Sequence, residues 1–156
     1  MPGRNAPIQL NVPHLQQPRA GDCLPACAYM VLHYLNRPIL YWRLRRILGT
    51  QDFGTPFLRI RTLERLRLTV EVATHGTVAL LREYLMHDQP VIVSIQTENL
   101  PYWSYNTLHA VVVTGMNETQ IYLNDPEFPT APIETPIGDF ELAWLPQDER
   151  YAVLIP

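Results

Sequence analysis

The fold of this chain is decided by one stretch of its sequence, Gln17-Pro-Arg-Ala-Gly-Asp22-Cys23-Leu-Pro-Ala26. Its second half predicts the start of a helix, because Asp22 is a suitable N-cap and Pro25 falls in the first turn, where a missing N–H costs nothing. Apolar residues then recur at helical spacing until Asn36-Arg37-Pro38 ends the run. The stretch therefore places Cys23 in the first turn of the strongest helix that the sequence predicts.

The periodicity changes after residue 68, from helical spacing to the β-branched runs that are typical of strands. Residues 1–21 are expected to be extended. Further helices are predicted at 40–48, within 56–66, at 77–86 and at 137–144. Strands are predicted at 70–73, 91–95, 109–115, 119–123 and 151–155, with a hairpin over residues 108–124 that turns at Asn117-Glu118. Helices followed by a mostly antiparallel sheet predict an α+β fold.

Length and composition favour a single domain spanning residues 1–156. The chain is 47% apolar and 17% charged, which is typical of a globular protein with a buried core. Residues 1–12 contain one arginine and no apolar core of signal-peptide length, and no run approaches the ~20 apolar residues that span a bilayer. Two cysteines four positions apart suit a reducing compartment. We therefore expect a cytoplasmic protein without a membrane segment.

The net charge of the chain is -3 at pH 7, which does not indicate a nucleic-acid-binding protein. The basic residues are locally balanced except in one stretch, which holds Arg43, Arg45, Arg46, Arg59, Arg61, Arg65 and Arg67. Two interpretations are open for this stretch, solvated helix faces or a phosphate-binding stripe, and the sequence favours solvated faces.

Three residues form a candidate catalytic constellation. A cysteine at a helix N-terminus is favoured as a thiolate, and its partner histidine should lie on another element. His109 begins an otherwise apolar strand, and Asp125 follows the paired strand, so the hairpin should place residues near 109 opposite residues near 124. Each residue alone has an ordinary interpretation, as a core cysteine, an edge histidine or an Asp-Pro turn. Their combination in one small chain predicts a nucleophilic site.

Two blocks of the sequence resemble a known family. The first is Gln17 to Ala26, with a glutamine six residues before the Cys23 of an Asp-Cys pair. The second is His109-Ala-Val-Val-Val-Thr-Gly115 followed by Asn124-Asp125-Pro126. Together they resemble the bacterial peptidases that remove double-glycine leaders from bacteriocin precursors. The similarity extends over about residues 10–155.

The resemblance implies a papain-like cysteine protease fold, with N-terminal helices packed on a mostly antiparallel sheet. It also implies that Cys23 is the nucleophile, His109 its base and Asp125 the residue that orients the histidine. Gln17 would help to form the oxyanion hole, and the six-residue spacing favours it over the neighbouring Gln16.

The sequence departs from the family in two respects. The residue after the nucleophile is Leu24, where the family usually has glycine, and this side chain is expected to narrow the cleft and to contact substrate. The leader peptidases are usually fused to a membrane-spanning exporter, whereas this chain has neither membrane segments nor a Walker-type loop. We therefore expect a stand-alone member of the family. Its specificity for double glycine is implied only by the resemblance and has to be tested.

Other residues near the site have less specific patterns. Tyr102 and Trp103 lie just before His109 and are candidates for a substrate-binding wall, with packing on the sheet edge as the alternative. Cys27 is expected in the core. Cys23, Cys27 and His33 lie on one helix without a fourth ligand at suitable spacing, so no metal and no cofactor is expected. His14, His33, His75 and His87 are expected to be surface or structural residues.

The sequence therefore predicts a cysteine endopeptidase that cleaves a peptide or protein substrate through a thioester acyl-enzyme, after Gly-Gly or another small-residue site. Two alternatives remain. One is a non-proteolytic module that binds leader peptides. The other is a different acyl-transfer enzyme on the same scaffold, namely an amidase, a deconjugating isopeptidase or a transglutaminase-like enzyme.

Overall fold

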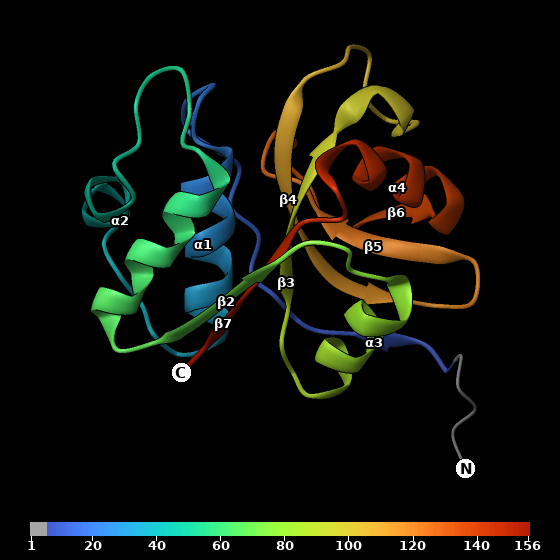
Figure 1. Ribbon diagram of the computed structural model, residues 1–156, viewed down its shortest axis with the longest axis horizontal. Coiled ribbons are helices and arrows are strands. Elements are labelled where there is room, and N and C mark those ends of the chain that lie inside the picture. The colour runs from blue at the N-terminus through green and yellow to red at the C-terminus, as the bar shows by residue number, and fades with distance from the viewer. Residues whose placement is uncertain (1–5) are drawn as a thin grey trace.

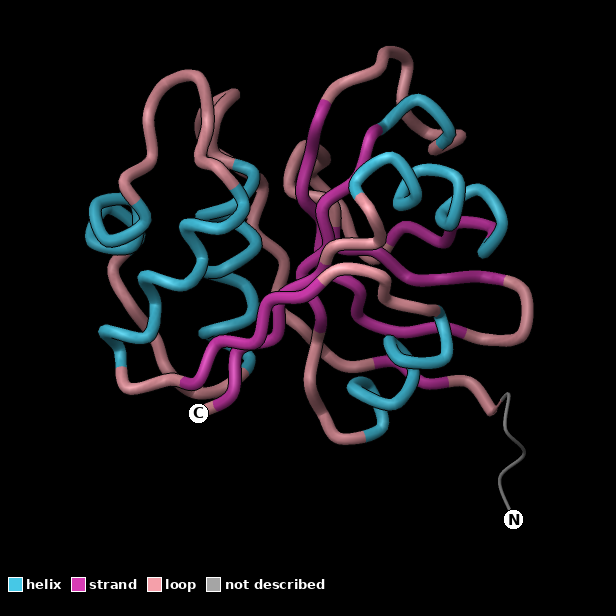
Figure 2. Tube along the Cα trace, in the orientation of Figure 1, coloured by secondary structure: helices cyan, strands magenta, loops and turns pink. Residues whose placement is uncertain are grey.

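The structure is a computed structural model that describes residues 6–156. An antiparallel sheet runs through its centre, with helices on both faces (Figures 1 and 2). The α-helices are α1 (Cys23–Tyr34), α2 (Tyr41–Leu48), α3 (Val78–Met86) and α4 (Ile137–Trp144). The 3-10 helices are η1 (Phe57–Leu66), η2 (Thr97–Asn99) and η3 (Leu145–Gln147). The strands are β1 (Ile8–Gln9), β2 (Thr69–Ala73), β3 (Val91–Gln96), β4 (Leu108–Met116), β5 (Gln120–Asn124), β6 (Ile133–Pro136) and β7 (Tyr151–Ile155).

The sheet has the order β2-β7-β3-β4-β5-β6, and every pairing in it is antiparallel. The short β1 pairs with the end of β4, where Gly115 faces Gln9. A Cβ at Gly115 would overlap the carbonyl oxygen of Ile8 and the ring of Tyr122, so glycine is required for this close approach. This antiparallel sheet, with helices on both of its faces, confirms the predicted α+β class.

Two cores lie on opposite faces of the sheet. On one face, α1, α2 and η1 pack over residues such as Ile92 and Val112, and we call these three helices the helical lobe. On the other face, α3 and α4 pack over residues such as Val93 and Val111. Because neighbouring strand residues alternate between two buried faces, β3 and β4 are apolar along nearly their whole length. This explains the continuous apolar runs in the sequence.

Most predicted elements are present with small changes at their ends. The helix at 137–144 and the strand at 151–155 have the predicted limits. The helix at 40–48 begins one residue later and ends, as predicted, at Gly49, which is in the left-handed conformation (φ 69°). The helix expected within 56–66 is a 3-10 helix. The strands β1 and β6 were not predicted, and β6 lies in a proline-rich segment that masks the strand pattern.

The predicted register of the 108–124 hairpin is wrong. Asn124 faces Val112 rather than a residue near His109, a difference of three positions. The hairpin closes between Asn117 and Gln120, where the Asn117 N–H donates to the carbonyl oxygen of Gln120, and this turn sets the register. A bulge between Val113 and Gly115 shifts the register by only one residue, toward His109. Asp125 thus lies beyond the end of the strand pairing, and another feature must bring it to His109.

Candidate active site

The N-terminal end of α1 carries Cys23, whose side chain is partly exposed. Asp22 precedes the helix, but its side chain does not cap it, which corrects the sequence prediction. The Asp22 carboxylate is instead buried, where it accepts a hydrogen bond from the Tyr41 hydroxyl (2.8 Å) and forms an ion pair with Arg45 (3.1 Å). Asp22 therefore ties the start of α1 to α2, and this contact holds the cysteine in place.

Gly21 allows a second segment to approach the cysteine closely. A Cβ at Gly21 would lie 2.5 Å from the carbonyl oxygen of Asp52 and 2.8 Å from the amide nitrogen of Gly54. These contacts are with backbone atoms, which cannot move aside as a flexible side chain would. Glycine at position 21 therefore lets the loop before η1 lie directly beside the nucleophile.

His109 and Asp125 form a buried pair. His109 Nε2 lies 2.7 Å from Asp125 Oδ1, and the side-chain exposures are 5% and 0%. The carboxylate faces the imidazole because a tight turn follows β5, in which Asp125 Oδ1 also accepts a hydrogen bond from the Glu127 N–H (3.0 Å). Local turn geometry, rather than strand register, thus brings the two residues together.

The carboxylate of Asp125 accepts two more hydrogen bonds from side chains. The Tyr102 hydroxyl (2.8 Å) and the Trp103 indole N–H (2.9 Å) both donate to Oδ2. The Trp103 ring also contacts the His109 ring edge-on, with centroids 4.8 Å apart. Tyr102 donates to Asp125 and is not among the residues that line the pocket described below, and its contact with substrate stays a prediction. Trp103 has both positions, since it contacts the pair and lines the pocket.

Charge distribution at this pair favours an imidazolium facing a carboxylate. Burial alone would lower the pKa of His109, but interactions with Asp125 and with Cys23 outweigh it and raise that pKa to about 9. For Asp125, burial alone would raise the pKa, but the hydrogen bond and the charge of His109 hold it below the usual range. Cys23 thus lies within interaction range of a histidine that stays protonated well above neutral pH.

Cys27 lies one helical turn after Cys23 and is fully buried in the core, as predicted. Burial, followed by the nearby charges of Cys23 and Asp125, raises the pKa of the Cys27 thiol well above its ordinary value. A thiol in this environment stays neutral and unreactive. The chain therefore contains one accessible thiol and one core thiol, both free.

A pocket of about 530 Å³ opens beside Cys23 and His109. One wall comes from the helical lobe, through Gly21, Leu24 and the loop that leads into η1. The opposite wall comes from the sheet, through Ser94 of β3 and residues that surround His109. Leu24 lines the pocket but is only 1% exposed, because its side chain packs into the helical core. Leu24 therefore forms part of the floor, and its effect on the width of the cleft and on substrate stays a prediction.

Gln17 lies in a segment that runs alongside the turn after β5. Its backbone N–H donates to the carbonyl oxygen of Pro126 (2.7 Å), which places it next to Asp125 in the chain fold. Its side-chain nitrogen donates to the carbonyl oxygens of Arg19 and Ala20 (2.9 Å each). The neighbouring Gln16 is exposed and donates to the carbonyl oxygen of Glu127. Both Gln17 side-chain N–H groups are thus engaged by neutral backbone acceptors.

Sequence reasoning missed several residues of the site. The loop before η1, which includes Phe53, was not recognised as a wall of the pocket, because its position depends on the close approach at Gly21. Glu127 also lines the pocket, and its place directly after Asp125-Pro126 was the only signal for it.

Within residues 6–156, no group of three or more His, Cys, Asp or Glu side chains has an arrangement that would hold a metal ion. In the same residues, no helix has both the length and the apolar character needed to cross a bilayer.

Three solved structures share this fold over nearly its whole length. The first is a protein from Bacillus anthracis described as a C39-like peptidase by similarity, with a TM-score of 0.78 and 16% identity over 96% of this chain and 98% of that one. The second is a double glycine motif protease from an AMS/PCAT transporter in complex with the leader peptide, with a TM-score of 0.71 and 19% identity over 96% and 97%. The third is the peptidase domain of Streptococcus ComA, a bifunctional ABC transporter, with a TM-score of 0.73 and 20% identity over 91% and 96%.

At these identities the solved structures show the fold alone, and no curated protein matches the chain. Sequence similarity to a family model supplies the assignment, since the model of the Peptidase_C39 like family matches residues 9–151. That range contains Cys23, His109 and Asp125. The chain therefore belongs to the Peptidase_C39 like family of cysteine peptidases.

Proposed function

We propose that the chain is a cysteine endopeptidase in which Cys23 attacks the scissile carbonyl and His109, held by Asp125, protonates the leaving amine. Water then hydrolyses the acyl-enzyme thioester, which releases the carboxyl product and restores the Cys23 thiol. One observation carries the proposal above the others, namely that the only partly exposed thiol lies within interaction range of a buried histidine paired at 2.7 Å with a carboxylate. This arrangement supplies a nucleophile, an acid and an orienting group in one pocket.

The proposed substrate is a peptide or protein cleaved after Gly-Gly or another pair of small residues. The double glycine motif protease among the similar structures binds a leader peptide. Gly21 and the loop before η1 border the nucleophile, and they are the proposed contacts for the substrate residues next to the scissile bond. Fluorogenic peptides with Gly-Gly, Ala-Gly and Leu-Leu before the cleaved bond test this proposal, and we expect the highest kcat/KM for Gly-Gly.

Reactivity of the two cysteines gives the first test of the nucleophile. We expect iodoacetamide at pH 7 to label Cys23 at least about 100-fold faster than Cys27, because the latter is buried and its thiol pKa is raised. His109→Ala should slow the labelling of Cys23 by about tenfold or more, since it removes the partner imidazolium. Labelling is followed by mass spectrometry of the peptides, with the denatured protein as the control in which both thiols react. Equal rates at the two cysteines in the folded protein would exclude the assignment.

Gln17 is proposed as an oxyanion donor together with the Cys23 backbone N–H. In the free enzyme its N–H groups contact neutral carbonyl oxygens, and exchange of one of them for an anionic oxygen gives a stronger, charge-assisted hydrogen bond. The donor would thus act in the transition state more than in substrate binding.

We expect Gln17→Ala to lower kcat by about 100- to 1,000-fold with KM nearly unchanged. Gln16→Ala is the matched control, because Gln16 also donates to one backbone carbonyl beside the site and is expected to matter little. Steady-state kinetics on one peptide substrate separate the two variants. If Gln16→Ala costs as much as Gln17→Ala, the assignment of the oxyanion donor is wrong.

A further inference from the structure

Basic residues of this chain are concentrated in one segment. All twelve are arginines, and eight of them lie in residues 37–67, where they face only two acids, Asp52 and Glu64, for a net charge of +6. The rest of the chain has four arginines and thirteen acids, for a net charge of -9. The segment comprises α2, η1 and the loop between them, which form the outer part of the helical lobe (Figure 1).

Within the described residues, seven of these eight arginines have no carboxylate partner. Arg45 alone forms an ion pair, with Asp22. Arg37, Arg59 and Arg61 donate to backbone carbonyl oxygens, and the Arg46 guanidinium lies 4.5 Å above the centre of the Trp42 ring. Solvated helix faces usually carry both signs of charge. The unpaired arginines therefore differ from the solvated helix faces that the sequence favoured for this stretch.

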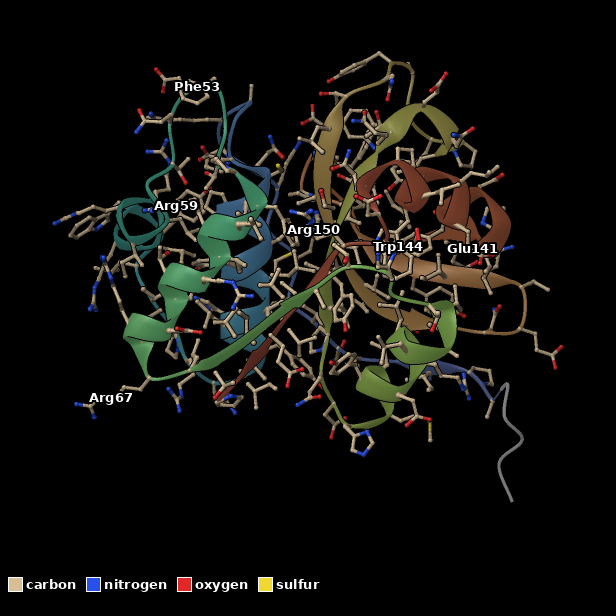
Figure 3. The ribbon with its side chains drawn as sticks, in the orientation of Figure 1. Phe53, Arg59, Arg67, Glu141, Trp144 and Arg150 are labelled. Atoms are coloured by element: carbon tan, nitrogen blue, oxygen red, sulfur yellow. The ribbon has the colours of Figure 1, made fainter. Side chains whose placement is uncertain are left out.

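The same segment exposes large apolar side chains. The exposed fractions are 63% for Leu40, 56% for Trp42, 87% for Phe53 and 52% for Leu58. Figure 3 shows Phe53, Arg59 and Arg67 spread from one end of the helical lobe to the other, with Phe53 at the tip of the loop. The surface therefore combines guanidinium groups with exposed tryptophan, phenylalanine and leucine side chains. We call the exposed residues of segment 37–67 the arginine–apolar surface.

We propose that the arginine–apolar surface binds the anionic surface of a lipid bilayer. Segments that bind the membrane interface typically combine arginines with exposed tryptophan, phenylalanine and leucine. Their apolar side chains enter the headgroup region, and their guanidinium groups bind lipid phosphates. A nucleic acid would match the arginines and would stack its bases on the aromatic rings, but it would leave the exposed Leu40 and Leu58 without contacts. Since the remainder of the chain is acidic, an anionic membrane attracts this face and repels the rest, so the protein is oriented as it binds.

This orientation has a consequence for the cleft. Phe53 belongs to the arginine–apolar surface and also lines the pocket beside Cys23. A helical lobe that lies on a bilayer therefore holds one rim of the pocket close to the lipid headgroups. The proposal rests on charge and exposure alone and is independent of the chemistry at Cys23.

Vesicle binding by the full chain tests the proposal. We expect co-sedimentation with vesicles that contain phosphatidylglycerol, weaker binding as salt is raised, and no binding to vesicles of phosphatidylcholine alone. The double variant Arg43→Gln/Arg46→Gln should bind about 25-fold more weakly, at about fivefold per arginine. Arg82→Gln on α3 is the control for each single arginine, because it removes one positive charge outside the surface, and it should change binding less than twofold.

Tryptophan fluorescence adds a second measurement. A blue shift on addition of anionic vesicles should disappear in Trp42→Phe, which separates Trp42 from Trp103 and from the buried Trp144. Thermal unfolding of each variant checks that the fold is kept. Equal binding to both kinds of vesicle, or a double variant that binds like wild type, would overturn the proposal. Tighter binding to a 20-base-pair DNA duplex than to anionic vesicles would overturn it as well and would assign the surface to nucleic acid.

Discussion

Cys23→Ala is expected to lower kcat/KM for every cleaved peptide by about 10,000-fold or more, since loss of the nucleophile in a catalytic triad has an effect of this size. Alanine keeps the helix propensity of the first turn of α1 and leaves the pair of His109 and Asp125 in place. We expect the unfolding temperature to change by only a few degrees and the Kd for an uncleaved substrate peptide to stay within about threefold. Kinetics, calorimetry and peptide binding measure these three quantities on one variant.

The control for this prediction is Cys27→Ala. It removes a thiol from the core, at a cost of about 1 kcal/mol in the free energy of unfolding, and should leave kcat/KM within a few fold of wild type. The pair of variants also separates the peptidase from a module that only binds peptides. A wild-type protein that binds peptides and cleaves none, with the same Kd as Cys23→Ala, would favour the binding module.

Asp125→Asn is expected to move the alkaline limb of the pH profile of kcat/KM to lower pH. Because the pKa of His109 is raised to about 9, the imidazolium that protonates the leaving amine persists through neutral pH and is lost only as the pH rises through about 9. The neutral amide removes a hydrogen-bonded charge that favours the imidazolium, so the limb should move by about one to two pH units toward the ordinary value near 6.5. We expect kcat at pH 7 to fall by about 100- to 10,000-fold.

Four hydrogen-bond donors face the carboxylate of Asp125, and an asparagine offers only one acceptor oxygen to them. The variant is therefore also destabilised, and its unfolding temperature must be measured with its kinetics. Tyr102→Phe is the milder comparison, since it removes one donor and keeps the ring. We expect a small shift of the alkaline limb for Tyr102→Phe. An alkaline limb that stays near pH 9 in Asp125→Asn would show that Asp125 does not control the histidine.

The sequence predicted the parts of the fold that depend on local patterns. The helix that carries Cys23, the helix at 137–144 and the strand at 151–155 follow from spacing, proline positions and β-branched runs, and they are present. The predicted hairpin register was wrong because the hairpin closes between Asn117 and Gln120, and the sequence does not show which residues close the turn. The residues proposed for catalysis were all named, although their proximity came from the turn after Asn124 rather than from the strand pairing.

Partners of side chains were harder to predict than their positions. Asp22 was interpreted as a cap, whereas its carboxylate is buried against Tyr41 and Arg45 of the next helix. Tyr102 was interpreted as a candidate for substrate contact, whereas it donates to Asp125. Both outcomes depend on contacts between segments about 20 residues apart or more, which spacing along the chain does not report. Seven arginines of segment 37–67 were singled out in the sequence, but only the structure showed that seven of the eight arginines in that segment lack a carboxylate partner within residues 6–156.

The most direct test of the central claim is capture of the acyl-enzyme. The protein is mixed with a Gly-Gly p-nitroanilide peptide, quenched with acid within one turnover and digested for mass spectrometry. We predict that the peptide's acyl group is found on the fragment that contains Cys23, that hydroxylamine releases it as expected of a thioester, and that Cys23→Ala carries none. Turnover with the acyl group on any other residue, or an unchanged adduct in Cys23→Ala, would contradict the account.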